Sequence, residues 1–155
     1  MQNRLKMGPN GIALLTESEA LRLTPYNDPR NFATVGYGHL IRRGPVVAAD
    51  QPITREQALE YLIADLVVPE TIVFEEVVPQ LNQNQFDAVV DFVYNEGAGN
   101  FERSSLLTYL NNGLRPYDPG RVAVLLGAYD EGGGRILPGL ITRRAKEAEL
   151  FNTPV

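Results

Sequence analysis

The stretch Glu19–His39, EALRLTPYNDPRNFATVGYGH, is the part of the chain around which the rest is organised. Glu19 ends an apolar helical pattern, Asp28 follows nine positions later in a turn-rich segment, and Thr34 comes six positions after that. A helix end, a loop and a strand can bring such side chains to one cleft. Two carboxyls and a hydroxyl around a cleft suit hydrolysis of a glycosidic bond, which requires a general acid and a group that directs a water.

The residues before Glu19 predict an amphipathic helix. A Gly-Pro-Asn-Gly turn precedes it, and Asn10 is the expected N-cap. Ile12, Leu15 and Glu19 fall at positions i, i+3 and i+7, so they share the helical face that turns inward. Glu17 lies about 200° from Glu19 around such a helix and is expected in solvent.

The next segment is rich in turn residues. Prolines and asparagines between residues 25 and 31 predict turns, where Asp28 by itself is more typical of an Asx turn than of a catalyst. Residues 32–37 alternate loosely and predict a strand, followed by a hairpin or a close backbone approach at two nearby glycines. His39, taken alone, is more typical of a structural hydrogen bond or ion pair.

A helical connector is predicted over residues 53–79. Thr54 and Gln57 form a capping box, so a helix should begin at Thr54. Pro69 should kink or break this helix, and a further helical piece should end before Pro79. The apolar face expected for the first part consists of Leu59, Leu62, Ile63 and Leu66.

The remainder of the chain predicts helices packed on one central helix. Asn82 or Asn84 should cap a helix whose apolar residues nearly encircle it, and Gly97 should end it. Ser104 or Ser105 should cap a shorter helix. Further expected elements are a helix over residues 122–128, a flexible glycine loop over 131–134 and a last helix from Pro138 to about Phe151.

The order of these elements predicts an α+β fold. The 155 residues suffice for a single domain, residues 1–155, with one sizeable core. Within it, a small strand-bearing lobe, roughly residues 12–52, is joined by the connector to a helical lobe, roughly residues 80–155.

Composition excludes several classes of protein and site. There are no cysteines and one histidine, which argues against a disulfide scaffold and against thiolate or histidine metal sites. Hydrolysis of a glycosidic bond by two carboxyls needs no metal and no cofactor, so none is expected. The net charge is −5, and the arginine pairs at 42–43 and 143–144 are more typical of solvated surface than of a face that binds nucleic acid. No segment approaches the roughly 18 apolar residues of a membrane span. Because the N-terminal residues lack the apolar core of a secretory signal, we expect synthesis in the cytoplasm without membrane insertion.

Several motifs together resemble one known family. Glu19-x8-Asp28-x5-Thr34, followed by Val-Gly-Tyr-Gly-His39, is similar to the active-site signature of the phage-type lysozymes, or endolysins, of glycoside hydrolase family 24. The resemblance continues through LNQNQFDAVV from Leu81, YNEG from Tyr94, FERSSLL from Phe101 and GGRILPGLITRRAKEAELF from Gly133. Each piece alone is weak, but their order and separations make the set specific over nearly the whole chain.

The resemblance implies a lysozyme-like fold and an inverting muramidase. Its substrate would be bacterial peptidoglycan, cut at the β-1,4 bond between N-acetylmuramic acid and N-acetylglucosamine. Glu19 matches the general acid, Asp28 the carboxylate that assists the water and Thr34 the residue that helps to hold it. The positions of family members' glycan contacts are matched by Leu40, Tyr94, Ser104 and Arg144, the last being an arginine that pairs with the catalytic glutamate.

The resemblance also implies a setting for the protein. A lysozyme of this kind acts in host lysis as a monomer, made in the host cytoplasm and reaching the periplasmic cell wall after the inner membrane is breached. In a phage a holin makes that breach without being a bound partner.

Three features depart from the family pattern. The family often has Phe-Glu-Gly around the acid, whereas this chain has Ser18-Glu19-Ala20, and alanine is tolerated there only with a negative φ. Tyr129 stands near a place where a tryptophan is common. The acidic net charge gives no long-range attraction to an anionic wall.

Two other functions remain open from the sequence. One is a catalytically silent glycan-binding or virion structural module, against which the intact Glu19, Asp28 and Thr34 argue. The other is a hydrolase with Ser104 or Ser105 as nucleophile and the histidine as base, which the missing Gly-x-Ser-x-Gly elbow disfavours.

Overall fold

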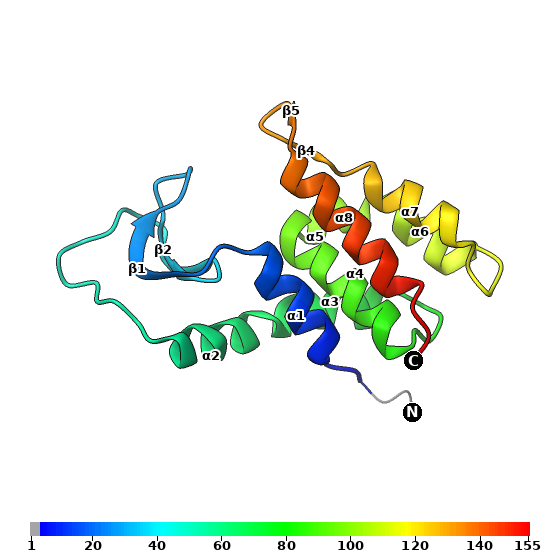
Figure 1. Ribbon diagram of the computed structural model, residues 1–155, viewed down its shortest axis with the longest axis horizontal. Coiled ribbons are helices and arrows are strands. Elements are labelled where there is room, and N and C mark those ends of the chain that lie inside the picture. Colours follow the sequence, from blue (N-terminus) through cyan, green and yellow to red (C-terminus); the bar gives the residue numbers. More distant parts are fainter. Residues whose placement is uncertain (1–3) are drawn as a thin grey trace. The chain divides into compact units, whose positions relative to one another are not determined.

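The computed structural model describes residues 4–155, and the chain divides into two compact units (Figure 1). Residues 16–67 form a strand-bearing unit. Residues 4–15 and 68–155 form a helical unit. The boundaries differ from those expected, because most of the helix before Glu19 belongs to the helical unit and the connector is divided between the two. The α+β fold itself is confirmed.

The strand-bearing unit is built on an antiparallel sheet of three strands. In sequence and spatial order they are β1 (Arg22–Asn27), β2 (Ala33–Gly36) and β3 (His39–Arg42). The expectation of turns from residue 25 was wrong, because Pro25 lies within β1. Proline cannot donate to a ladder, but β1 is an edge strand and tolerates it. The β2–β3 hairpin was expected, and its glycines Gly36 and Gly38 have φ of 69° and 87°.

Helix α2 (Arg55–Asp65) packs on this sheet. Its predicted capping box is confirmed: the Thr54 hydroxyl accepts from the Gln57 N–H at 3.1 Å, and the Gln57 side chain accepts from the Thr54 N–H at 2.9 Å. The buried face consists of Ala58, Leu62 and, at the C-cap, Leu66, whereas Leu59 and Ile63 of the expected face are exposed. The register of the face was therefore only half right.

The helical unit surrounds α4 (Gln83–Glu96), which has its buried side chains on most of its circumference. Asn82 is its N-cap, with a capping box to Gln85, and Gly97 ends it with a φ of 87°. Asn84, the alternative cap, is buried and donates instead to the carbonyls of Thr153 and Pro154. The predicted central position of α4 is confirmed, and α8 (Pro138–Phe151) lies beside it (Figure 1).

The other helices of this unit close the core around α4. These helices are α3 (Val67–Glu76), α5 (Ala98–Glu102), α6 (Ser105–Asn112) and α7 (Pro119–Gly127). Of the two serines expected to cap α6, Ser104 is the N-cap, and Asp118 caps α7.

Helix α1 (Pro9–Ser18) is anchored on α4 by a buried carboxylate. Asn10 is not the N-cap, because the helix begins one residue earlier with Pro9 at its first position. Asp87 accepts from the N–H groups of Gly8 at 2.9 Å and Gly11 at 3.0 Å, and so replaces a local cap. Burial raises the pKa of the Asp87 carboxyl, against these hydrogen bonds, which lower it.

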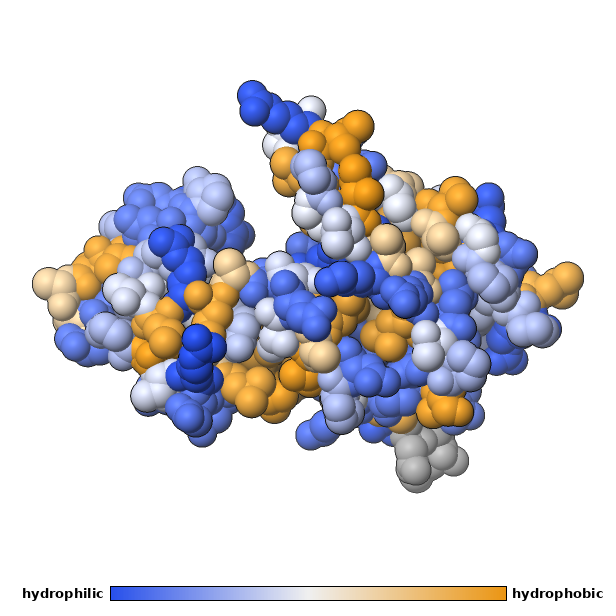
Figure 2. Space-filling view, viewed as in Figure 1, coloured by the Kyte–Doolittle hydropathy of each residue, from blue (hydrophilic) through white to orange (hydrophobic). Residues whose placement is uncertain are grey.

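The glycine segment after α7 is a short hairpin and not a flexible loop. β4 (Glu131–Gly132) pairs with β5 (Arg135–Ile136), and Gly133 and Gly134 turn between them with φ of 60° and 78°. Positive φ at both central residues is the requirement of a type I′ turn. Exposed apolar side chains of Ile136, Leu137 and Ile141 follow, and Figure 2 shows apolar surface over the hairpin and the start of α8.

Candidate active site

Glu19 follows directly on the end of α1 at Ser18 and is half-buried, whereas Glu17 is exposed. The exposure of Glu17 is as expected, whereas Glu19 lies beyond the last helical residue and so on no helical face. Among residues 4–155, Asn31 is the one non-glycine residue with a positive φ, so Ala20 follows Glu19 without left-handed strain.

Asp28 organises the loop between β1 and β2. Its Oδ1 accepts from the N–H groups of Arg30 at 2.8 Å and Phe32 at 2.9 Å, which is the expected Asx-turn geometry. Its Oδ2 accepts from Arg30 Nε at 3.1 Å and Nη2 at 3.0 Å. The Phe32 N–H, and after it the Arg30 side chain, lower the pKa of the Asp28 carboxyl despite some desolvation. Asp28 is thus held ionised at neutral pH.

Thr34 lies in the middle of the sheet, between Tyr26 on β1 and Leu40 on β3. Directly paired residues of antiparallel strands project to the same face, so these three side chains form one row. Thr34 is 5% exposed and donates its hydroxyl to the Phe32 carbonyl at 3.0 Å, which leaves the oxygen able to accept. Leu40 is 40% exposed.

Tyr26 links the predicted carboxyls, although sequence reasoning did not select it. Burial raises the pKa of its phenol; Arg22 lowers it, and the charges of Glu19 and Asp28 raise it further. The guanidinium carbon of Arg22 lies 4.0 Å from the centre of the Tyr26 ring. Both carboxylates therefore act electrostatically on one phenol, and that phenol lies in the row that contains Thr34. Recognition of β1 as a strand would have placed Tyr26 there.

His39 has the structural role that was expected of a lone histidine. Its Nδ1 lies 2.8 Å from Asp65 Oδ2 on α2, and its ring stacks on Tyr61 with centroids 4.3 Å apart. These contacts tie β3 to α2.

The remaining predicted glycan contacts belong to the helical unit. Tyr94 is half-buried on α4. Ser104 is 1% exposed, and its hydroxyl donates to the Phe101 carbonyl at 2.6 Å and accepts from the Leu107 N–H at 3.0 Å. That hydroxyl is committed to capping α6, which also removes it as a nucleophile.

Arg144 lies in a buried ionic cluster of α4 and α8. It is 1% exposed, its Nη1 donates to both carboxyl oxygens of Glu147 at 2.9 Å, and its Nη2 contacts Asn95. Glu96 Oε1 is 3.7 Å from Nη2. The Arg144 Nε is the one buried side-chain nitrogen or oxygen of the described residues without a hydrogen-bond partner. The pairing of Arg144 with the catalytic glutamate, which the family resemblance implies, stays a prediction.

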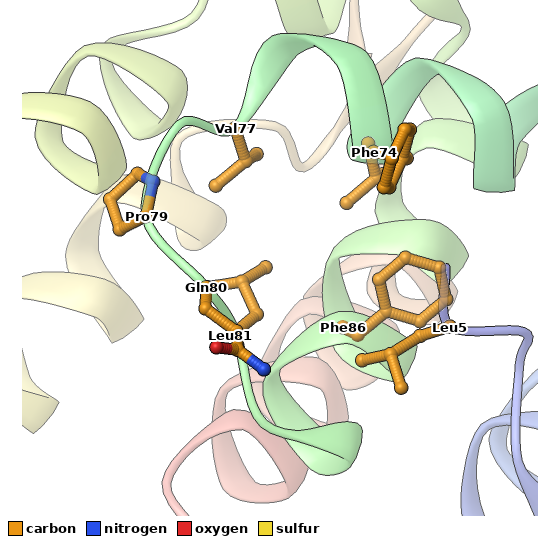
Figure 3. A pocket seen from close by; sticks show the side chains of 8 residues that line it. Leu5, Phe74, Val77, Pro79, Gln80, Leu81 and Phe86 are labelled. Atoms are coloured by element: carbon orange, nitrogen blue, oxygen red, sulfur yellow. The ribbon is translucent and has the colours of Figure 1, made fainter. Parts of the chain in front are cut away.

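Two cavities differ in their volume and in their position relative to the candidate site. The apolar pocket of Figure 3 lies between the end of α3 and the start of α4 and has a volume of about 40 Å³. Sites for small molecules usually have volumes of at least about 300 Å³, so this pocket is too small for a sugar. A cavity of about 440 Å³ in the strand-bearing unit is lined by His39 and Ile41 of β3. Because strand residues alternate, it lies on the face opposite Leu40 and the proposed site.

Two kinds of feature are absent from the described part of the chain. No helix within residues 4–155 combines the length and the apolar character needed to cross a bilayer. The same residues contain no group of three or more histidine, aspartate or glutamate side chains arranged to hold a metal ion.

Comparison with known proteins identifies the family. The phage lysozyme family model matches residues 16–147. The endolysin of Salmonella phage P22 is 35% identical over 95% of this chain and 98% of its own length. The endolysin of Bacillus phage PZA is 36% identical over 96% of this chain, which spans 56% of that relative's length. The solved structure of the muramidase domain of SpmX from Asticaccaulis excentricus matches with a TM-score of 0.83 at 33% identity, over 97% of this chain and 100% of that one. The chain therefore belongs to the phage lysozyme family.

Proposed function

We propose that this protein is a lysozyme that hydrolyses the β-1,4 bond between N-acetylmuramic acid and N-acetylglucosamine in bacterial peptidoglycan, with inversion. The observation that carries the proposal is the pairing of Thr34 with Tyr26 in the sheet, together with the electrostatic effect of both Glu19 and Asp28 on the Tyr26 phenol. Membership of the phage lysozyme family supports the substrate.

Each member of the set has a different task in this mechanism. Glu19, half-buried at the end of α1, donates its proton to the leaving glycosidic oxygen. Asp28, held ionised by its loop, assists a water that attacks the opposite face of the sugar. Thr34 offers its hydroxyl oxygen to the same water. An inverting site requires room for that water, so the two carboxyls should lie roughly 6.5–9.5 Å apart with glycan bound.

Other residues are proposed to bind the glycan. Leu40, which shares the sheet face of Thr34 and is exposed, provides an apolar contact to the sugar. Tyr94 can stack on a sugar ring, and Arg144 is proposed to act on the catalytic glutamate. The Ser104 hydroxyl is proposed to make no direct contact with the glycan, because it is buried and engaged in capping α6.

The proposed setting is host cell lysis. The protein would be made in the host cytoplasm and act as a monomer on the periplasmic wall after a holin breaches the inner membrane. Expression in a bacterium should then be tolerated until that membrane is permeabilised. Spontaneous lysis, prevented by inhibition of the general secretion pathway, would contradict this route.

The test of function is the chemistry of the released ends. Purified protein is incubated with purified peptidoglycan, and the muropeptides are identified by mass after separation. Reducing N-acetylmuramic acid ends are expected. Anhydro-muramic acid ends would instead indicate lytic transglycosylation, released peptides an amidase, and unchanged peptidoglycan a catalytically silent module.

A further inference from the structure

The two oxygens of Asp28 are held by different kinds of donor. Oδ1 accepts from the backbone N–H groups of Arg30 and Phe32 at 2.8 and 2.9 Å. Oδ2 accepts from Arg30 Nε and Nη2 at 3.1 and 3.0 Å. An ionised carboxylate offers about four acceptor sites, so these four N–H groups account for all of them. A water directed by Asp28 must therefore share or replace one of these donors.

The donors of Oδ1 cannot leave without rearrangement of the loop. The Asp28 N–H donates to the Phe32 carbonyl at 2.9 Å, and the Asn31 N–H donates to the Asp28 carbonyl at 2.8 Å. Asn31 has a φ of 61°, a conformation that asparagine tolerates better than most residues. The backbone around Oδ1 is thus fixed by its own hydrogen bonds.

The donors of Oδ2 can move independently of the backbone. The Arg30 side chain is 71% exposed, and exposed ion pairs are weak. Its guanidinium is nevertheless guided, because its carbon lies 4.8 Å from the centre of the Phe32 ring. Oδ2 is therefore the oxygen at which a water can take the place of one N–H while the other remains.

We propose that Arg30 is a positioning residue for the hydrolysis, in that its guanidinium holds Asp28 Oδ2, the oxygen that directs the attacking water, in a fixed orientation. This inference rests on the function proposed above. It assigns to Arg30 a role towards the carboxylate and none towards the glycan.

The charge of Arg30 has a second effect on the same carboxyl. The Phe32 N–H lowers the pKa of Asp28 most, and the Arg30 side chain and backbone lower it further. Asp28 also acts electrostatically on the Tyr26 phenol of β1, on which Arg22, lying over its ring, and Glu19 act as well. Without the guanidinium, Asp28 takes up its proton at a higher pH, although the Phe32 N–H still opposes protonation.

The experiment compares Arg30→Gln and Arg30→Lys with the parent on soluble, uncross-linked glycan strands. Arg30→Gln should move the acid limb of the kcat/KM profile to higher pH and lower kcat a few-fold on the plateau, with KM unchanged. Arg30→Lys keeps the charge without the two-pronged geometry, so it should restore the acid limb more fully than kcat. Arg43→Gln removes an exposed arginine of the same unit and should leave the profile of the parent.

An acid limb in Arg30→Gln that coincides with the parent would overturn the proposal, as would a raised KM with unchanged kcat, which would indicate a glycan contact. A lowered melting temperature alone would show a purely structural role. Failure of the proposed function would be visible in the parent itself, which would release no reducing ends. In that case NMR titration of the Asp28 carboxyl still tests the inference, because Arg30→Gln must raise its midpoint and Arg43→Gln must not.

Discussion

At the scale of single residues, the proposed function depends on which of two nearby glutamates is the acid. Glu19 is half-buried and acts electrostatically on Tyr26 together with Asp28, whereas Glu17 is exposed. The local environment, and not the side-chain chemistry that both share, separates their proposed roles.

Glu19→Gln should abolish turnover while the protein stays folded, because the amide keeps the shape of the side chain but cannot donate the proton. General acid–base catalysis contributes roughly 10²–10⁴ in rate, so the loss should be unmistakable in a turbidity assay on stripped cells. Glu17→Gln is the matched control and should stay within a few-fold of the parent. Near-normal activity of the Glu19 variant, with loss in the Glu17 variant, would refute the assignment of the acid.

At the scale of elements, the glycines of the helices differ in the space around them. A Cβ on Gly11 of α1 would lie 2.6 Å from Met7 Cγ and 2.8 Å from Asp87 Cγ, whereas one on Gly139 of α8 would meet nothing within 4 Å. Gly11 thus permits the close approach of α1 to α4 that lets Asp87 cap the helix.

The same substitution should therefore have opposite effects at the two positions. Gly11→Ala forces Asp87 and Met7 aside and should cost about 1–3 kcal/mol of unfolding free energy, the usual cost of overpacking. Gly139→Ala should be neutral or stabilising by up to about 1 kcal/mol, because alanine is the better helix former. Urea unfolding of both variants measures the difference. Equal free energies of unfolding would mean that α1 does not approach α4 this closely.

At the scale of the whole molecule, the helical unit carries a buried ionic cluster between its two main helices. Arg143 donates to both oxygens of Asp91 at 2.9 Å, and Arg144 binds Glu147. Burial, and then the neighbouring Asp91, raise the pKa of Glu147 well above its usual range, although both arginines oppose this. The stability contributed by Glu147 is therefore fully present below its unfolded pKa and is lost as the pH rises through its higher folded pKa.

Glu147→Gln should flatten the decline of stability with rising pH. The amide stays neutral, so the variant avoids the cost of a buried charge at the alkaline end and should there be at least as stable as the parent. Melting temperatures across the pH range test this, with the exposed Glu149→Gln on the same helix as the control. Parallel curves for the parent and Glu147→Gln would contradict the prediction.

The net charge of −5 affects how the whole molecule approaches its substrate. A cell wall is also negative at neutral pH, and screening shortens their repulsion from about 30 Å at 0.01 M salt to about 10 Å at 0.1 M. Activity on whole walls should therefore rise from very low to moderate ionic strength. A monotonic fall would mean that a local basic surface outweighs the net charge.

Much of the architecture was readable from local sequence signals. The capping box at Thr54, the end of α4 at Gly97 and the start of α8 at Pro138 were all predicted, and Asn82 was one of the two caps expected for α4. Such signals are readable because capping and helix termination are decided by neighbouring residues. The spacing of Glu19, Asp28 and Thr34 likewise selected the candidate site, and whether these residues catalyse stays a prediction.

Tertiary structure decided what local signals could not. Strand β1 was not predicted, because it contains Pro25 and proline is tolerated only where a strand lies at the edge of a sheet. Because the strand was not recognised, its residue Tyr26 was not recognised as part of the site. Asn10 lost its capping role because Asp87, distant in sequence, takes the N–H groups of α1. The expectation that Arg143 and Arg144 lie in solvent was wrong, because both are buried and pair with buried acids. The reason is the same: residues that meet only on folding determine which charges are buried.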